Sequence, residues 1–107
     1  MELTDEVRAR MDVSDDPDGG LVVTLAGELD LASLPAVASP LDELLSRRQQ
    51  PVVLDLAELS FLDSSGVAVL VRIANHFDRV RTRSATQPVR RVIEVLGLAA
   101  RFGLEEH

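Results

Sequence analysis

A short apolar run between two helical patterns places the strongest constraint on how this chain can fold. Pro51-Val52-Val53-Leu54-Asp55-Leu56 is too short for a buried helix and begins with proline, as is typical of a central strand. Residues 33–48 before it and residues 64–78 after it carry apolar side chains at helical spacing. A buried strand with a helix on either side in sequence predicts the α/β class, in which helices cover a sheet.

The remaining segments extend this order to β-β-α-β-α-β-α. Residues 8–26 resemble a hairpin around a turn rich in Asp, Pro and Gly, residues 79–85 alternate like a strand, and Pro88 starts a last helix. The order predicts a small mixed β-sheet flanked by α-helices. We also expect residues 98–104 to fold back on the body as an apolar tail.

Several residues are predicted to shape these helices. Ser33 is expected to cap the helix at 33–48, and Pro40 to kink or divide it. Gly97 is expected to end the last helix. The core-facing stripe of that helix is predicted to be Val89, Val92, Ile93 and Leu96.

Composition narrows the function classes. The 107 residues contain no cysteine, which excludes disulfides and zinc–thiolate sites, and they carry a net charge of −7, which disfavours nucleic acid or an anionic membrane as partner. No apolar run approaches the length that spans a membrane. The prediction is a single soluble, cytoplasmic domain over 1–107, with no cofactor and no metal site.

The charge is unevenly distributed along the chain. Residues 1–63 contain fourteen acidic and four basic residues, whereas residues 64–107 contain four acidic and seven basic ones. One interpretation is chance together with the acidic composition of the hairpin turn. That turn is not expected to be a calcium loop, because Leu25 stands where the loop would need a bidentate glutamate. The other is one acidic face that suits a basic partner.

The segment Leu59-Ser60-Phe61-Leu62-Asp63-Ser64-Ser65-Gly66-Val67 carries the most specific chemical signal. It joins a predicted strand to the start of a helix, where free backbone N–H groups and the positive end of the helix dipole favour negative charge. A phosphate on Ser64 or Ser65 would therefore be compatible with the fold. The plainer alternative is that Asp63 or Ser64 only caps the helix and that nothing reacts.

This segment resembles the signature of STAS domains, and specifically of anti-sigma factor antagonists. Three further stretches fit the same family in the same order: Leu25–Asp30, Val52–Leu56 and Pro88–Leu98. The resemblance covers roughly residues 8–104 and implies a STAS-like fold. Strand 79–85 departs from the family pattern, because it carries Arg79, Arg81 and Arg83 where an apolar strand is usual; it is either an exposed edge strand or the preceding helix ends early.

The resemblance implies a partner-switching regulator of transcription. Such a protein binds an anti-sigma factor serine kinase when unphosphorylated, is inactivated by phosphorylation at Ser64, and is restored by a serine phosphatase. The implied partner-binding residues are Asp30, Asp63, Ser65, Gly66, Ala68, Val69 and Arg72. Ala68 and Val69 are expected to be exposed apolar residues of that surface.

Two other function classes remain open. A STAS subunit of a lipid-transport or other membrane ATPase complex, never phosphorylated, is the alternative within the family. An enzyme would need catalytic groups that the sequence does not offer, because lysine is absent and His76 is expected to be solvated on a polar helix face. The chain is therefore expected not to be an enzyme.

Overall fold

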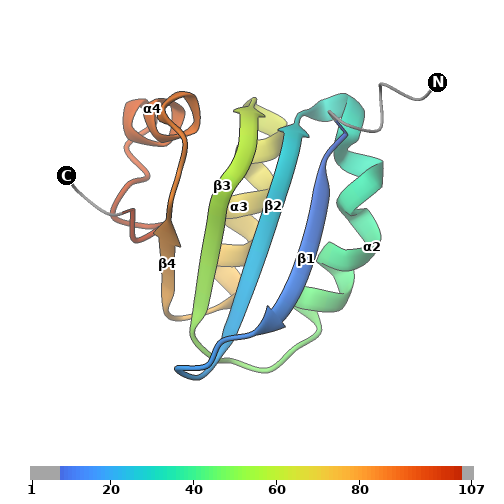
Figure 1. Ribbon diagram of the computed structural model, residues 1–107, viewed down its shortest axis with the longest axis vertical. Coiled ribbons are helices and arrows are strands. Elements are labelled where there is room, and N and C mark those ends of the chain that lie inside the picture. The colour runs from blue at the N-terminus through green and yellow to red at the C-terminus, as the bar shows by residue number, and fades with distance from the viewer. Residues whose placement is uncertain (1–7, 105–107) are drawn as a thin grey trace.

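The computed structural model describes residues 8–104, and its centre is a mixed β-sheet (Figure 1). The parts of the predicted domain before residue 8 and after residue 104 lie outside the described residues. Within that range the sheet has the order β1-β2-β3-β4. β1 is antiparallel to β2, while β2, β3 and β4 run parallel. The strands are β1 (Arg10–Asp15), β2 (Leu21–Leu29), β3 (Val52–Leu62) and β4 (Val80–Arg83).

The helices follow the carboxyl ends of the parallel strands. A 3-10 turn, η1 (Leu31–Ser33), leads from β2 into α2 (Leu34–Leu45), α3 (Ser64–His76) follows β3, and α4 (Gln87–Val95) follows β4. Figure 1 shows α2 and α3 together behind one face of the sheet and α4 beyond its β4 edge. The predicted α/β class with a mixed sheet is confirmed. The core between sheet and helices includes Leu25, Leu54, Leu56, Leu44, Leu70 and Ile73.

Strand β3 is longer than the predicted 51–56. It continues to Leu62 because β2 also continues to Leu29, and these two residues are register partners. The pairing absorbs two irregularities, between Thr24 and Ala26 and between Gly27 and Glu28. Gly27 has a φ of 86°, a conformation that glycine adopts without steric cost. As a result, the strand runs directly to the start of α3 and fixes where that helix begins.

The start of α2 differs from the prediction. Ser33 occupies the residue before the helix but makes no side-chain capping bond to it. Its hydroxyl donates to the backbone oxygen of Glu28 at 2.7 Å and belongs to a capping box that Asp30 forms around η1. Pro40 does not divide α2, which runs unbroken from Leu34 to Leu45. A proline removes only one intrahelical bond, and buried α2 side chains pack the helix against the core.

The arginine-rich segment is an edge strand, one of the two predicted outcomes. Arg81 and Arg83 are exposed, whereas Thr82 between them is only 1% exposed. The Thr82 hydroxyl donates to the Phe102 carbonyl at 2.8 Å, and its N–H donates to the Gly103 carbonyl at 3.0 Å. The predicted tail therefore does fold back, and it covers the outer edge of β4.

Helix α4 ends as predicted, but its stripe is one residue shorter. Gly97 has a φ of 74° and donates to Glu94, while Leu98 donates to Ile93, which together form a Schellman motif. Leu96, expected to face the core, is 53% exposed. It lies at the end of the helix, where the chain turns away at Gly97. Among residues 8–104, no helix is long and apolar enough to cross a membrane.

Candidate functional site

The segment singled out by sequence lies where the carboxyl ends of β2 and β3 meet. Leu29 and Leu62 are register partners at the ends of the two strands. The Asp63 N–H donates to the Leu29 carbonyl at 3.3 Å, and the Leu31 N–H donates to Asp63 Oδ2 at 3.2 Å. The loop after β2 is thereby joined to the start of α3.

Asp63 is the N-cap of α3, one of the two residues that the sequence offered for this role. Its Oδ1 accepts the Gly66 N–H at 2.9 Å, and this bond is the main reason that the pKa of the carboxyl is lowered from its ordinary value of 3.8. Desolvation opposes the shift, and the Leu31 N–H adds to it. The Asp63 side chain is therefore a carboxylate at neutral pH.

The two serines of the motif differ in accessibility. Ser64 is exposed and is the first residue of α3, whereas Ser65 is half-buried. Ser64 thus offers a hydroxyl to solvent at the positive end of a 13-residue helix, beside the Asp63 carboxylate. A group added to its oxygen would extend into solvent without displacing core atoms.

Asp30 lies in the loop that is bonded to Asp63, the residue before this serine. It precedes Leu31, whose N–H bonds Asp63, and its own Oδ1 accepts the Ser33 N–H at 3.0 Å. The position of Asp30 in the loop beside the motif agrees with the sequence expectation. Asp30 and Asp63 therefore both lie where the carboxyl ends of β2 and β3 meet.

A groove runs between α2 and α3, beginning beside the motif. This α2–α3 groove has a volume of about 280 Å³. Its lining includes Leu34, Ala38 and Leu41 from α2 and Ser65, Ala68 and Arg72 from α3. Ala68 and Arg72 are exposed at its rim, in agreement with their predicted placement on the surface.

Val69 and Gly66 do not lie on the open surface. Val69 also lines the groove but is only 5% exposed, so the expectation that it is an exposed apolar residue is wrong. α3 packs against both the sheet and α2, which buries a wider stripe than one face. Gly66 is buried as well. The backbone of β2 lies so close to it that an added Cβ would come within 2.2 Å of the Leu29 oxygen.

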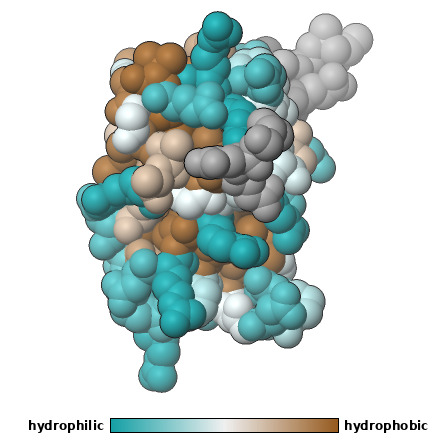
Figure 2. Space-filling view, turned by 90° about the vertical axis from the view of Figure 1, so that its left-hand side faces the viewer, coloured by the Kyte–Doolittle hydropathy of each residue, from teal (hydrophilic) through white to brown (hydrophobic). Residues whose placement is uncertain are grey.

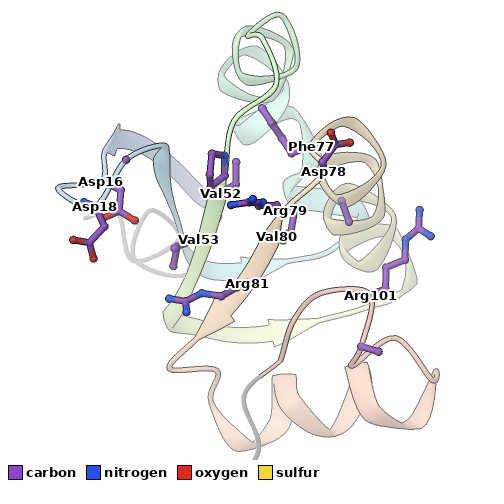
Figure 3. A pocket seen from close by; sticks show the side chains of 14 residues that line it. Asp16, Asp18, Val52, Val53, Phe77, Asp78, Arg79, Val80, Arg81 and Arg101 are labelled. Atoms are coloured by element: carbon purple, nitrogen blue, oxygen red, sulfur yellow. The ribbon is translucent and has the colours of Figure 1, made fainter.

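The acidic residues do not form one continuous face. Asp16 and Asp18 lie in the β1–β2 turn, at the opposite end of the sheet from the carboxyl ends of β2 and β3 (Figure 1). There they line a cavity of about 610 Å³, together with Asp78, Arg79, Arg81 and Arg101 (Figure 3). Of the two sequence interpretations, the acidic hairpin accounts for these charges better than a single acidic surface.

Sequence reasoning missed two exposed hydrophobic residues near the motif. Leu31 is 69% exposed in η1, and Phe61 is 45% exposed two residues before Asp63. The predicted second strand ended at residue 26, so nothing marked residue 31 as belonging to this site. A leucine directly after Asp30 is the one signal that was available.

His76 is not the solvated residue that was expected. Its Nε2 lies 2.8 Å from the Arg47 carbonyl, and its ring meets that of Phe77 edge-on. Because a carbonyl only accepts, the Nε2 must be the donor, and the contact connects the end of α3 to the loop after α2. Within residues 8–104, no three His, Cys, Asp or Glu side chains gather as metal ligands.

The fold and the strand–helix motif define a recognisable class. A model of the family described as "Mlab, STAS domain" matches residues 13–105. The chain belongs to the STAS domain family.

Three proteins similar to this chain are described as anti-sigma factor antagonists. The chain is 35% identical over 85 residues to the anti-sigma F factor antagonist of Paenibacillus polymyxa, covering 75% of this chain and 73% of that protein. The crystal structure of an anti-sigma factor antagonist from Mycobacterium paratuberculosis superposes with a TM-score of 0.72 at 26% identity, over 92% of this chain and 86% of that one. The anti-sigma factor antagonist SpoIIAA in its unphosphorylated form shares the fold, with a TM-score of 0.60 at 19% identity, over 91% and 89%.

The capping role of Asp63 predicts a pH-dependent contribution to stability. Because folding lowers the pKa of its carboxyl below 3.8, the stabilisation is complete above that pH and is lost as the pH falls through the folded value. Asp63→Ala is expected to lower the melting temperature at neutral pH, by a margin that shrinks below about pH 3.8. Thermal denaturation followed by circular dichroism across this range measures it.

The matched control is Asp78→Ala, at an exposed aspartate in the loop after α3. It is expected to leave the melting temperature close to that of the wild type throughout. An Asp63→Ala deficit that persists undiminished at the acid end would show that the carboxylate charge is not what stabilises the start of α3.

Proposed function

We propose that this chain is an anti-sigma factor antagonist that binds an anti-sigma factor serine kinase when unphosphorylated and is inactivated by phosphorylation at Ser64. The observation that carries the proposal is the exposed Ser64 hydroxyl at the first residue of α3, beside a capping carboxylate. Two of the similar proteins, from Paenibacillus polymyxa and Mycobacterium paratuberculosis, are anti-sigma factor antagonists and support it.

The electrostatics of the motif support a switch that leaves the fold intact. A phosphate adds roughly −1.5 to −2 charges at pH 7. On Ser64 it would lie at the positive end of α3, which tolerates negative charge. The Asp63 carboxylate is already ionised there, so the local surface becomes strongly negative while α3 stays in place. A partner that fits the unphosphorylated surface then meets both bulk and repulsion.

The proposed kinase-binding surface surrounds this serine. Asp30, Asp63 and Ser65 border it, and Ala68 and Arg72 extend it along the rim of the α2–α3 groove. Gly66 and Val69 contribute by shaping the backbone and the groove rather than by exposed side chains. In this proposal the chain is not itself an enzyme, because the kinase and a serine phosphatase supply the catalytic groups. The proposed protein acts in the cytoplasm, and it neither binds nucleic acid nor inserts into a membrane.

A second candidate function is a subunit of a membrane ATPase complex. The family model that matches this chain is described as a STAS domain and not as an antagonist, so it leaves open a member of the family with another role. Such a subunit would use the same exposed surface for permanent association and would need no phosphoacceptor. Co-purification with an ATPase, without any modification of Ser64, would favour it over the antagonist.

Mapping of phosphate after incubation with a candidate anti-sigma factor kinase from the same genome and ATP tests the proposal. Mass spectrometry of tryptic peptides is expected to place one phosphate on Ser64, and Ser64→Ala is expected to abolish labelling. Ser65→Ala, the matched neighbour, is expected to retain it. Phosphate on another residue, or equal labelling of Ser64→Ala, would refute the assignment.

A further inference from the structure

Leu31 is an exposed hydrophobic residue on a fixed turn. Within residues 8–104, four large hydrophobic residues are strongly exposed: Leu31, Phe61, Val95 and Leu96. Leu31 is 69% exposed and lies in the turn between β2 and α2. A single exposed leucine is ordinary on a protein surface. Its hydrogen bonds and its position are what set it apart.

The turn that carries Leu31 is held on both sides. The Leu31 N–H donates to Asp63 Oδ2, and the preceding Asp30 exchanges hydrogen bonds with Ser33 in the capping box. The Ser33 hydroxyl in turn donates to the Glu28 carbonyl. A side chain on such a fixed turn loses little backbone freedom when a partner covers it, so its burial goes largely into affinity.

Leu31 also belongs to the immediate surroundings of Ser64. Its N–H is bonded to the residue directly before that serine. Phosphoryl transfer requires the attacking hydroxyl to lie in line with the γ-phosphate. An enzyme that brings its nucleotide to the Ser64 oxygen must therefore cover the surface around Asp63, and η1 is part of that surface.

We propose that Leu31 is the apolar anchor through which the enzyme that phosphorylates Ser64 recognises this chain. The proposal rests on the proposed function and adds the chemistry of the partner, which must offer a small apolar pocket beside its phosphoryl-transfer site. The negative charges of Asp30 and Asp63 beside Leu31 require that this pocket have a basic rim. Leu31 makes no contact with the transferred group, so its effect falls on binding.

Val95 and Leu96 provide the contrast. They lie at and just after the end of α4, which Figure 1 places beyond the β4 edge, at the opposite side of the sheet from α2. Figure 2 shows hydrophobic side chains gathered at the upper end of that face, where α4 lies. Leu96 is 53% exposed and is the same residue type as Leu31. It therefore controls for the loss of an exposed leucine as such.

Steady-state kinetics of Ser64 phosphorylation test the proposal, with the kinase, ATP and four variants: Leu31→Ala, Leu31→Asp, Leu96→Ala and Leu96→Asp. For Leu31→Ala the KM for the chain is expected to rise roughly tenfold, which corresponds to about 1.4 kcal/mol, with little change in kcat. Leu31→Asp is expected to raise it further. The Leu96 variants are expected to behave as wild type, and melting temperatures should show that all four are folded.

Equal KM values for the Leu31 and Leu96 variants would overturn the proposal while leaving the phosphorylation of Ser64 standing. A fall in kcat at unchanged KM would also overturn it, because Leu31 would then position the serine rather than anchor the partner. If wild-type Ser64 accepts no phosphate at all, the proposed function fails and this inference fails with it.

Discussion

Replacing Ser64 with glutamate is expected to weaken binding to the anti-sigma factor by roughly a hundredfold, about 2.7 kcal/mol. The glutamate adds a carboxylate at an exposed position directly beside Asp63, whose own carboxylate is held ionised by the Gly66 N–H. An interface that buries Ser64 would have to desolvate two like charges side by side. Isothermal titration calorimetry with the purified partner measures the change.

The control places the same charge elsewhere. Ser14 is an exposed serine near the end of β1, at the end of the sheet opposite to the carboxyl ends of β2 and β3 (Figure 1). Ser14→Glu is expected to bind within about twofold of wild type. A loss of similar size in both variants would mean that total charge, rather than charge at Ser64, governs the complex. Unchanged binding of Ser64→Glu would remove the physical basis of the switch.

Substituting Gly66 with alanine is expected to lower the free energy of unfolding by roughly 2 to 3 kcal/mol. A Cβ at this position would lie 2.2 Å from the Leu29 oxygen and 2.7 Å from Leu62 Cδ1. The Leu29 oxygen belongs to the backbone of β2 and cannot move without disturbing the strand. In an exposed helix the same change would stabilise by about 1 kcal/mol, so the two effects predict opposite signs.

Urea denaturation distinguishes the two signs, with Gly97→Ala as the comparison. Nothing lies within 4 Å of a Cβ at Gly97, but its φ of 74° disfavours any other residue, so a loss of about 1 kcal/mol is expected there from the backbone alone. A Gly66→Ala protein as stable as wild type would show that β2 and α3 are not packed as tightly as described. The consequence for function would be a less fixed Ser64.

Most of the fold could be predicted from the sequence. Hydrophobic spacing identified the three helices, the hairpin and the central strand, because each element buries one face or both. The predictions failed mainly at the ends of helices and strands. The last residues of β3, Ala57 to Phe61, are mostly exposed, so their apolar content did not reveal a strand that exists because β2 pairs with it. By sequence alone Ser33 is expected to cap the helix that follows it, whereas its hydroxyl donates to the carbonyl of Glu28 in the preceding strand.

The candidate site was predictable where it is local in sequence. Asp63, Ser64 and Gly66 are consecutive or nearly so. Asp and Ser are both preferred helix caps, so the sequence narrowed the cap to Asp63 or Ser64, and the structure shows that it is Asp63. The contact from Leu31 to Asp63 joins residues 32 apart, and only the parallel pairing of β2 with β3 brings them together. The burial of Val69 has the same origin, since it depends on α2 lying beside α3.

Titration of the partner before and after phosphorylation shows whether a phosphate on Ser64 switches binding off. The wild-type chain is titrated into the anti-sigma factor kinase, then phosphorylated to completion at Ser64 and titrated again, and finally treated with a serine phosphatase. We expect tight binding at first, a loss of at least roughly a hundredfold in affinity after phosphorylation, and full recovery after dephosphorylation. Equal affinity of the two forms, or no binding by the unphosphorylated chain, would contradict it.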